Sequence, residues 1–591
     1  MKERRSETGL QGVTSQPRFG EGGYFDLALV LEIVPVRRHP KFISRSASHR
    51  VQHTVQHSLM ESGIHLVNRP GSLGRFSTAN PATGQPLSDY PIATAADVLA
   101  AVAQARQAQL WWSRMPQLRR SAVLRRVAQL LCDRKESIVR VITSESGKPL
   151  QEALLSDIMV AADAAVFCAD NAAVAMRSQK IPHDNPALRF KRGKLSWEPL
   201  GVIGIIAPWN YPLSIPAADV FAALVTGNAV VLKPSELTPE TALELERVVA
   251  AALDAEGLGA LPRPFHVVTG LGPTGQSLIA SGIDKLVFTG SVSTGRRVAI
   301  ACAERLLPVV LELGGKDAMI VLHDADLDTA SSAAVWGSMM NAGQTCISVE
   351  RCYVHRSVYS PFLARCLDKI SKLKVGDGAL PDTDVGPLIS FNQLQIVDHQ
   401  VEEARALGAI VHTGGTPMPQ LGSNFYAPTL ITDVEPSMSL MSEETFGPIL
   451  PVMPFSTDEE AIALANASDF GLAASVWGRT AHATAIARRI AAGTVLVNDL
   501  ISGFAVSAAP HGGLKQSGIG RTHGLLGLQE MIRPRYLDVD LLPRMKKLWW
   551  YPYSGLFAPM AAFIDFIHAP GFGHRLKALL RSIPMLLLRR R

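Results

Sequence analysis

The sequence predicts an α/β protein with a parallel-sheet domain, a second α/β domain and a small β-excursion. This prediction rests on two alternations of strand-length apolar runs with helix-length stretches, one over 201–306 and one over 309–498. The chain has 591 residues, of which 47% are hydrophobic and 19% are charged. It is therefore long and apolar enough for more than one core.

The first 75 residues show no sustained periodicity and are expected to form a partly disordered N-terminal extension. Within it, His49, His53 and His57 would share one helix face. No acidic or cysteine partner accompanies them, so we interpret them as part of a plain extension rather than a metal site. Order is expected from a turn at 79–87. Amphipathic spacing then predicts three helices, at 95–108, 117–146 and 148–179.

The first alternation predicts four strands, each followed by a helix. The strands are 201–210, 229–236, 264–270 and 285–291, and the helices are 213–226, 239–255, 274–282 and 294–306. Such repeats give a parallel sheet covered on both faces, with ligands at the carboxyl ends of its strands. The residues at those ends are Asn210, Lys233, Ser235, Glu236 and Gly290.

The second alternation begins at 309–316 and predicts a second α/β domain. It continues with strands at 318–322, 350–355, 451–455, 472–478 and 494–498 and helices at 326–341 and 359–371. The charged segment 188–198 lies between the first helices and the first sheet, and we interpret it as the excursion.

Charge is spread unevenly along the chain. The net charge is +6, yet 541–591 carries nine basic residues and one acidic residue, and 1–75 carries eleven basic and six acidic residues. The intervening 76–540 is therefore net negative, at −7. This pattern argues against a nucleic-acid partner for the body and directs any anionic partner to the two ends.

The six cysteines form no CxxC pair and show no ligand-like spacing with histidine. Neither a disulfide framework nor a metal site is therefore expected, and a reducing, cytoplasmic setting is. We see no secretory signal. No run reaches the roughly 20 apolar residues expected of a transmembrane helix.

Two motifs fit a nucleotide. "GSVSTG" (290–295) follows a strand and opens a helix, where its glycines would let a phosphate approach; a plain strand–helix turn is the alternative. In "KPSE" (233–236), Lys233 and Glu236 could hold the two ribose hydroxyls. The acid would repel a 2′-phosphate and so favour NAD over NADP. A helix-capping Ser-Glu pair is the alternative.

Three residues could carry covalent chemistry. Glu312 precedes a Gly-Gly turn between apolar neighbours, which would raise its pKa and suit a general base; a surface charge is the alternative. Asn210 in "APWNYP" could donate to an oxyanion or serve as a turn residue. Cys346 in "NAGQTCISVER" could be a buried structural cysteine, a disulfide partner or a nucleophile.

The blocks "PWNYP", "KPSE", "FTGS", "ELGGK", "GQTC", "EETFGP" and "GG-x-K-x-SG" occur in an order that resembles the aldehyde dehydrogenase superfamily, over about 76–540. By that resemblance Cys346 matches the catalytic nucleophile, Glu312 the base that activates the deacylating water, and Asn210 the oxyanion-hole side chain. The implied cofactor contacts form a longer set: Trp209, Lys233, Ser235, Glu236, Gly290, Ser291, Gly295, Leu313, Glu444 and Phe446.

The resemblance also implies a domain plan and an assembly. A Rossmann-like NAD-binding domain would span 76–183 and 201–311, and a catalytic domain 312–510. The segments 184–200 and 511–540 would form oligomerisation strands. Family members form dimers or tetramers, so a homodimer or homotetramer is expected.

The expected reaction is the oxidation of an aldehyde to its carboxylic acid with NAD, or with NADP as the second option. It would pass through a thiohemiacetal and a thioester at Cys346. The presence of Glu312 favours hydrolysis over acyl transfer to coenzyme A. A non-catalytic protein that kept the fold is a third reading, which the intact Cys346, Glu312 and Asn210 disfavour. Gly343 and Thr345 are expected to leave room for the nicotinamide and the aldehyde carbonyl.

Two features depart from the common family pattern. His511 in "PHGGLKQSG" stands where an aromatic residue is usual, and we interpret it as a ring that fills this space rather than as a pH-tuning group.

The extension 541–591 combines tryptophans and tyrosines with a net charge of +8, and it resembles the membrane-associated branch of the family. It predicts a peripheral contact with an anionic membrane surface and an apolar, long-chain or aromatic, aldehyde substrate. A short basic helix interrupted at Pro584 is expected there, and a tail packed on its own or a partner subunit is the alternative.

Overall fold

The computed structural model describes residues 65–66, 74–547 and 549–588. The chain divides into two units, Met1–Thr54 and Val55–Arg591, and every described residue belongs to the second. The predicted N-terminal extension therefore lies outside the described residues, except for a few positions near its end. Its three histidines, His49, His53 and His57, lie outside them too.

The described chain opens with a small antiparallel sheet of three strands: β1 (His65–Leu66), β2 (Arg75–Ala79) and β3 (Pro86–Pro91). A turn joins β2 to β3, and in it the Asn80 carbonyl accepts a hydrogen bond from the Gly84 N–H (2.8 Å). The turn lies where the sequence predicts one.

Three helical stretches follow, as the sequence predicts, but two of them are interrupted. Arg134 (φ −99°, ψ 8°) leaves the helical region, so the predicted helix 117–146 is two helices. A seven-residue π-helical turn lies inside the third stretch. The elements are α2 (Ala95–Trp112), α3 (Gln117–Asp133), α4 (Lys135–Ser146), α5 (Leu150–Glu152), η1 (Ala153–Met159) and α6 (Val160–Ala175).

Among the described residues, one helical stretch is long and apolar enough to cross a membrane, although the sequence analysis expects none. It is Leu150–Ala175, with a mean hydropathy of 1.6 and 56% of its apolar window buried inside the protein. Its α6 part packs against α3 and α7, as the core helix of a globular domain does.

The first large sheet has six strands in the order β18-β10-β9-β6-β7-β8, all parallel except the edge strand β18. The strand β10 lies where the second apolar alternation starts, although the domain plan implied by the family resemblance keeps the chain up to 311 in the first domain. This strand pairs with β9, with Glu312 opposite Thr289, so the second sheet begins only after it. The strands and their helices are β6 (Val202–Ile206), α7 (Ser214–Val225), β7 (Ala229–Lys233), α8 (Pro239–Ala255), β8 (Phe265–Val267), α9 (Gly272–Ala280), β9 (Lys285–Thr289), α10 (Val292–Ala303), β10 (Val309–Glu312) and β18 (Gly518–Ile519).

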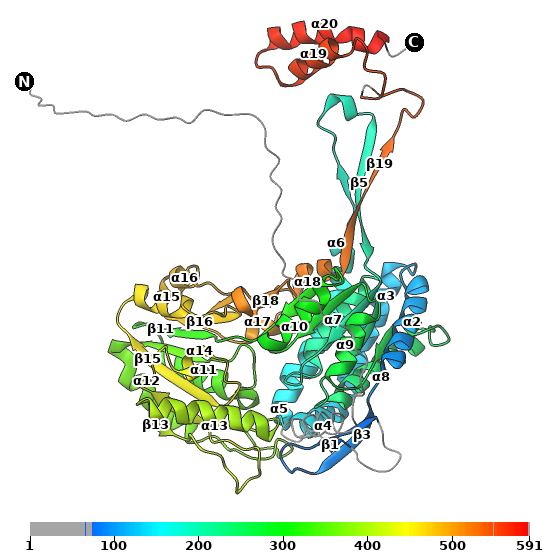
Figure 1. Ribbon diagram of the computed structural model, residues 1–591. Helices are drawn as coiled ribbons and strands as arrows, with labels where there is room; N and C mark the ends of the chain where they lie inside the picture. The colour runs from blue at the N-terminus through cyan, green and yellow to red at the C-terminus, as the bar shows by residue number, and fades with distance from the viewer. Residues whose placement is uncertain (1–64, 67–73, 548, 589–591) are drawn as a thin grey trace, which may run out of the picture. The chain divides into compact units, whose positions relative to one another are not determined.

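Both faces of this sheet are buried, as its apolar strands predict (Figure 1). Successive side chains of a strand point to opposite faces. Ile203 and Ile205 pack with α3, α6, α7 and α8, whereas Val202 and Val231 pack with α2, α9 and α10. Because the helices cover the two faces of the sheet, a ligand is expected at the carboxyl ends of its parallel strands.

The second large sheet has seven strands in the order β13-β14-β15-β12-β11-β16-β17, parallel except for the β13–β14 pair. The strands β13 and β14 are not predicted from the sequence, and each is only four residues long. The elements are β11 (Ala318–Val321), α11 (Leu327–Met339), η3 (Met340–Gly343), β12 (Arg351–His355), η4 (Arg356–Val358), α12 (Tyr359–Ile370), α13 (Phe391–Ala406), β13 (Ile410–Thr413), β14 (Thr429–Thr432), α14 (Ser439–Ser442), β15 (Ile449–Phe455), α15 (Asp458–Asn466), β16 (Ala473–Trp477), α16 (Thr480–Ala487), β17 (Thr494–Val497) and α17 (Ser502–Ala505).

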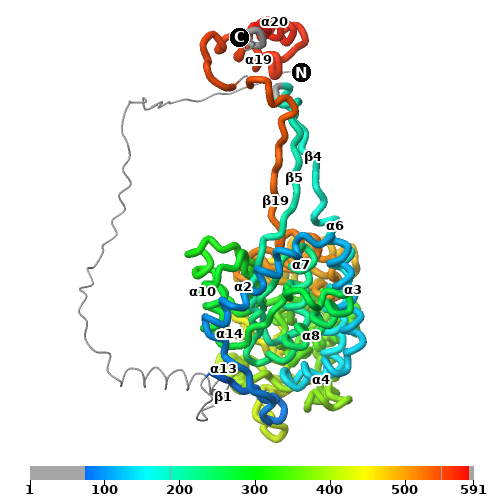
Figure 2. The backbone as a smooth tube through the Cα atoms, turned by 90° about the vertical axis from the view of Figure 1, so that its right-hand side faces the viewer, coloured from blue at the N-terminus to red at the C-terminus, as the bar shows by residue number. Residues whose placement is uncertain are grey.

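The excursion is a three-stranded antiparallel sheet of order β19-β5-β4 (Figures 1 and 2). It contains β4 (Gln179–Ile181), the short helix η2 (Pro186–Leu188), β5 (Lys191–Pro199) and β19 (Ile532–Asp540). The structure divides the predicted segment 511–540. Only β19 pairs with β5. The earlier part of the segment contains the short helix η5 (Lys515–Ser517), then β18, which extends the first large sheet, and then α18 (Gly524–Glu530).

The C-terminal extension contains two helices that pack on each other, α19 (Phe557–His568) and α20 (Phe572–Leu588). The predicted interruption at Pro584 is wrong, because Pro584 lies inside α20 and the helix continues beyond it. A proline inside a helix removes one hydrogen bond and usually kinks or breaks it, and this helix accommodates it near its end.

Candidate active site

The two large sheets meet around one cavity of about 270 Å³. It lies at the carboxyl ends of β6, β9 and β10 and at the amino ends of β11, β12, β15 and β16. All three predicted catalytic residues line it, with six of the predicted cofactor contacts: Trp209, Asn210, Gly290, Ser291, Glu312, Leu313, Cys346, Glu444 and Phe446. The other four predicted contacts, Lys233, Ser235, Glu236 and Gly295, do not line it.

Asn210 lies in the loop between β6 and α7, and a buried carboxylate holds this loop. Asp157, in the π turn η1, accepts hydrogen bonds from the N–H groups of Leu213 (3.2 Å) and Ser214 (3.1 Å) at the start of α7. Lys148 forms a buried ion pair with the same carboxylate (2.7 Å), which balances its charge. The π turn therefore supplies the group that fixes the Asn210 loop.

Two hydrogen bonds tie the Asn210 loop to the Cys346 loop. Asn341 Nδ2 donates to the Asn210 carbonyl (3.0 Å), and Asn210 Nδ2 donates to the Gln344 carbonyl (3.2 Å). The second N–H of the Asn210 amide makes no other hydrogen bond within the described part of the chain. That N–H is therefore free to donate to an oxyanion in the cavity.

The loop that precedes the thiol turns through three consecutive residues with positive φ, 341–343. A Cβ on Gly343 would lie 1.9 Å from the Gly447 carbonyl oxygen, so only glycine fits between the two loops. The Thr345 hydroxyl lies 2.6 Å from the Tyr211 hydroxyl. Packing and hydrogen bonding thus give both residues a structural role, and the expectation that they leave room for the nicotinamide and the aldehyde stays a prediction.

Cys346 is partly exposed to the cavity, and all six cysteines, which all lie in described segments, are free thiols. Burial raises the pKa of the Cys346 thiol, and the carboxylates of Glu444, Asp317 and Glu312 raise it further. The resting thiol therefore keeps its proton and must lose it when it attacks.

Glu312 ends β10 and is only 5% exposed, which excludes the surface-charge alternative. Neither carboxylate oxygen has a hydrogen-bond partner among the residues the structure describes. Burial raises the pKa of Glu312 well above its ordinary value, and the Asp219 carboxylate raises it further. An unpaired buried carboxyl group on a cavity wall suits proton transfer better than it suits stability.

His511 lies beside this carboxyl group without bonding to it. Its Nε2 atom is 4.0 Å from Glu312 Oε2, too far for a hydrogen bond. The His511 ring packs edge-on against Phe504, with 5.1 Å between ring centroids. Burial lowers the pKa of His511 to about 3 and that of the neighbouring His523 to about 4. Both rings are neutral at physiological pH, which supports the interpretation of His511 as a space-filling ring.

A second buried carboxylate near the cavity, Glu350, is fully paired. One of its oxygens lies 2.5 Å from Lys316 Nζ, and the carboxylate accepts hydrogen bonds from the N–H groups of Thr445 (2.9 Å) and Phe446 (3.1 Å). Lys316 also lies 3.0 Å from the Thr445 hydroxyl. These bonds fix the 444–446 loop against the start of β11 and β12.

The same loop presents Glu444 and Phe446 to the cavity. Glu444 accepts a hydrogen bond from the Gly315 N–H (3.0 Å), and burial raises its pKa to about 8. Phe446 packs edge-on against Trp209, with 5.4 Å between ring centroids. Gln393, which the sequence analysis does not identify, donates to the Phe446 carbonyl (3.1 Å) and also lines the cavity.

The predicted phosphate motif places Gly290 and Ser291 on the cavity wall, where Ser291 caps α10 through its side chain. Its glycines have packing reasons of their own. A Cβ on Gly290 would lie 2.8 Å from the Phe288 ring, and one on Gly295 would lie 2.4 Å from the Leu313 side chain. The expectation that the glycines let a phosphate approach closely stays a prediction. The capped helix end, which favours an anion, stays on the wall.

The "KPSE" residues lie at the carboxyl end of β7. Lys233 Nζ is 2.9 Å from Glu236 Oε2, and the Ser235 hydroxyl accepts a hydrogen bond from the Leu237 N–H (3.2 Å). The helix-capping alternative is not what the structure shows, because α8 starts at Pro239 after Thr238 and has no side-chain cap.

Sequence reasoning misses Asp219, which lies on α7, lines the cavity and has its pKa raised to about 7 by burial. A signal exists, since Asp219 is the one acidic residue in the otherwise apolar helix Ser214–Val225. The other missed wall residues lie on segments far apart in the sequence: Ile215, Gln393, Ile396, Leu472, Phe504, Thr522 and His523.

Comparisons with known proteins agree with this site. The model of the "Aldehyde dehydrogenase family" matches residues 68–537. The 4,4'-diapolycopene aldehyde oxidase of Methylomonas is 37% identical over 495 residues, which cover 83% of this chain and 91% of that protein. A putative succinate-semialdehyde dehydrogenase [NADP(+)] of Mycobacterium tuberculosis is 39% identical over 76% of this chain and 85% of its own.

Solved structures agree too. The NAD-dependent aldehyde dehydrogenase from Sinorhizobium meliloti has a TM-score of 0.75 at 37% identity and covers 79% of this chain and 92% of that one. The NAD+ complex of an aldehyde dehydrogenase from Bacillus cereus also has a TM-score of 0.75, at 34% identity, over 83% and 98%. The resemblance inferred from the motif order and the α/β fold are thereby confirmed. The chain belongs to the aldehyde dehydrogenase family and is an aldehyde-oxidising enzyme.

Proposed function

We propose that this enzyme oxidises an apolar aldehyde to its carboxylic acid and prefers NAD to NADP. The acid would be released by hydrolysis of a Cys346 thioester. One observation carries the proposal: one cavity is lined by the Cys346 thiol, the Asn210 amide and the Glu312 carboxyl group, which is buried and has no hydrogen-bond partner among the described residues.

The chain's own groups account for the covalent steps. Cys346 Sγ gives its proton to water and adds to the aldehyde carbon, and Asn210 Nδ2 and the Cys346 N–H donate to the resulting oxyanion. Departure of a hydride from that carbon leaves a thioester. Glu312 then takes a proton from a second water, and the hydroxide attacks the thioester carbonyl. The carboxylic acid is released, and Glu312 returns its proton to the departing Cys346 thiolate.

The cofactor, when bound, supplies the hydride acceptor. The residues that fit it are the capped start of α10 for the pyrophosphate, Glu444 and Trp209 on the cavity wall, and the Lys233–Glu236 pair at the end of β7. The acid at 236 supports an unphosphorylated ribose. Relatives are named for both NAD and NADP, so this preference is tested by comparing kcat/KM for the two.

The cavity wall supports an apolar substrate. Ile215, Ile396, Leu472 and Phe504 line it, and no lysine or arginine occurs among the described residues that do. Succinate semialdehyde, after which the mycobacterial relative is named, carries a carboxylate that would need such a cation. An aldehyde without a carboxylate, as in the name of the Methylomonas relative, fits this wall better.

The test is a panel of short-chain, long-chain and aromatic aldehydes with succinate semialdehyde, followed by NADH absorbance and product analysis. We expect acid formation without coenzyme A and the highest kcat/KM for the long-chain or aromatic members. A coenzyme A requirement with a thioester product would replace hydrolysis by acyl transfer. Inactivity on every aldehyde, with iodoacetamide labelling that NAD does not influence, would favour a non-catalytic protein.

The proposal includes a homodimer or homotetramer assembled through the excursion. The edge strand β19 exposes Tyr536, Leu537 and Val539, which are large apolar side chains on an unpaired strand edge. Light scattering coupled to size exclusion should give two or four chains per particle. In Leu537→Asp/Val539→Asp the particle should become smaller, and a wild-type monomer would refute the assembly.

The proposed location is the cytoplasm, with a peripheral contact between an anionic membrane and the extension. Free thiols support a reducing compartment, and the extension exposes Phe557 and Phe572, at 86% and 83%, beside the basic Arg575 and Arg581. The enzyme should sediment with anionic vesicles and not with zwitterionic ones, and Arg575→Glu/Arg581→Glu should release it. Equal recovery in the supernatant with both lipids would refute the contact.

A further inference from the structure

A second group of titratable side chains lies at the other edge of the seven-stranded sheet. The catalytic cavity is at the amino ends of β11, β12, β15 and β16, whereas this group follows the carboxyl ends of the same four strands. Carboxyl ends of parallel strands meet at one edge, where ligands commonly bind. The group consists of His323 and Asp324 after β11, His355 at the end of β12, Asp458 after β15, and Arg479 and His482 after β16.

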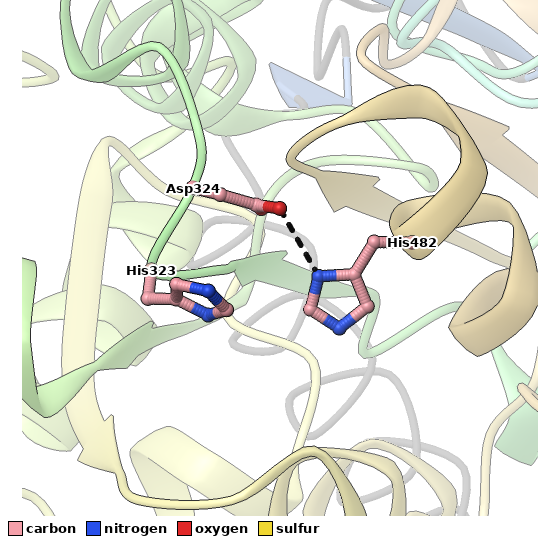
Figure 3. Close-up of side chains that lie close together, drawn as sticks. All are labelled: His323, Asp324 and His482. Atoms are coloured by element: carbon pink, nitrogen blue, oxygen red, sulfur yellow. Dashed lines mark hydrogen bonds and ion pairs between the residues drawn. The ribbon is translucent and has the colours of Figure 1, made fainter.

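His482 is held between two carboxylates. Its Nε2 atom lies 2.7 Å from Asp458 Oδ2, and its Nδ1 atom lies 3.2 Å from Asp324 Oδ2 (Figure 3). A neutral imidazole has one N–H and satisfies only one of these contacts. The shorter contact assigns that proton to Nε2, so the Nδ1 lone pair faces a carboxylate. A second proton or a metal cation must lie between Nδ1 and Asp324.

His323 supplies a further nitrogen ligand on the open side. Its ring lies beside that of His482, with 5.5 Å between centroids, and makes no hydrogen bond within the described residues (Figure 3). One ligand atom from each of His323, Asp324 and His482 lies within 4.8 Å of the other two. His323 is exposed, so its ring has room to turn toward the other ligands.

We propose that His323, Asp324 and His482 bind one transition-metal dication of the zinc type, with Asp458 positioning His482 from behind. Two imidazoles and a carboxylate, with water completing the shell, are the ligands of an open zinc site. Zinc–ligand bonds of about 2.0–2.1 Å place tetrahedral ligand atoms about 3.3 Å apart. The 3.2 Å separation between His482 and Asp324 already fits, and the His323 ring closes the site. A carboxylate behind a metal-bound histidine is the usual second partner.

A neighbouring cation, the Arg479 guanidinium, lies beside Asp324 and would compete with a metal ion for its carboxylate. Arg479 Nε lies 3.0 Å from Asp324 Oδ2. The Arg479 side chain is 80% exposed, so it has room to move away. The backbone N–H of Arg479 would still donate a hydrogen bond to Asp324 Oδ1. The Asp458 carboxylate holds the His482 ring from behind, with 2.7 Å between Nε2 and Oδ2, and leaves Nδ1 turned toward Asp324.

The sequence alone predicts no metal site, and the separation of the ligands along the chain explains why. Asp324 and His482 are 158 residues apart, so no short motif contains the ligands. The parallel strand order, with β11 between β12 and β16, brings them together.

The test is titration of the whole enzyme with Zn²⁺ at neutral pH, followed by calorimetry, and the same titration with Co²⁺ followed by absorbance. We expect one ion per chain and cobalt bands without a thiolate charge-transfer band, which excludes Cys346 as the ligand. His323→Gln and His482→Gln should lose this binding, and Asp458→Asn should weaken it about 10–100-fold. His399→Gln, which alters an exposed histidine on α13, is the matched control and should bind like the parent.

If His482→Gln does not fold, His323→Gln still tests the proposal, because His323 is exposed and makes no hydrogen bond to any described residue. Its thermal unfolding without metal and its aldehyde oxidation should match the parent, while Zn²⁺ should stabilise only the parent and the control. Equal binding by the parent and His323→Gln, or no binding by the parent at all, would overturn the proposal.

Discussion

Two buried carboxyl groups near the cavity, Glu312 and Glu350, differ in how they are paired. Glu350 has an ion pair with Lys316 and two backbone N–H donors, whereas neither oxygen of Glu312 has a partner among the described residues. The two residues are almost equally buried: Glu350 is 4% exposed and Glu312 is 5% exposed. Burial alone therefore does not assign a role. A fully paired carboxylate fixes the loops around it, and an unpaired one facing a cavity is available for proton transfer.

The largest effect on activity is expected from removing the Cys346 thiol. Cys346→Ala should reduce aldehyde oxidation to background, because no thioester forms, and should leave the thermal unfolding midpoint near that of the parent. Steady-state NADH formation and calorimetry measure the two. Retained turnover would show that Cys346 is not the nucleophile, so that Glu312 would have no Cys346 thioester to hydrolyse.

The next effect concerns stability and separates the two carboxyl groups directly. Glu350→Gln leaves the buried Lys316 charge unpaired and should destabilise the enzyme by about 3–5 kcal/mol in denaturant unfolding. Glu312→Gln removes no hydrogen bond within the described residues and should destabilise the enzyme clearly less than Glu350→Gln does. The double variant Lys316→Met/Glu350→Leu should recover part of the loss. Equal destabilisation by the two glutamine variants would remove the distinction.

A smaller effect is expected in the pH dependence. The raised pKa of Glu312 keeps it protonated at low pH, so deacylation should increase as pH rises through that pKa. Asp219→Asn removes a neighbouring carboxylate that raises this pKa and should move the rise to lower pH. Single-turnover acid release across pH measures both. An unmoved profile would show that Asp219 does not act on the base.

The smallest effect is expected at His511. Because burial keeps this ring neutral and 4.0 Å from Glu312, His511→Phe should change kcat little and leave the pH profile in place. His511→Ala, which leaves a gap beside Phe504, is the contrasting variant and should lower stability. A shifted pH profile in His511→Phe would make the ring part of the proton-transfer apparatus.

The sequence predicts the parts of the fold that have strong local signals. Strand-length apolar runs locate β6, β7, β9, β11 and β12, and motif order locates Cys346 and Glu312. It cannot decide which sheet a strand joins. The strands β10 and β11 are both short and mostly apolar, and the pairing of β10 with β9 places it in the first sheet.

The partners of the site residues are the part that sequence cannot supply. Glu350 stands in the motif that carries Cys346, yet its pairing with Lys316 and the Phe446 N–H depends on three segments that meet only in the fold. The same holds for Asp157, whose π turn reaches the start of α7. Short-range patterns identify reactive residue types, and tertiary contacts decide which of them are left unpaired.

Rapid-mixing kinetics of Glu312→Gln beside Glu350→Gln shows directly whether the unpaired carboxyl group is the deacylation base. If Glu312 is the deacylation base, Glu312→Gln should give a burst of about one NADH per active site, then turnover slower by about 10²–10⁴-fold. Any folded fraction of Glu350→Gln should turn over like the parent without such a burst. Normal steady-state turnover by Glu312→Gln would contradict the account.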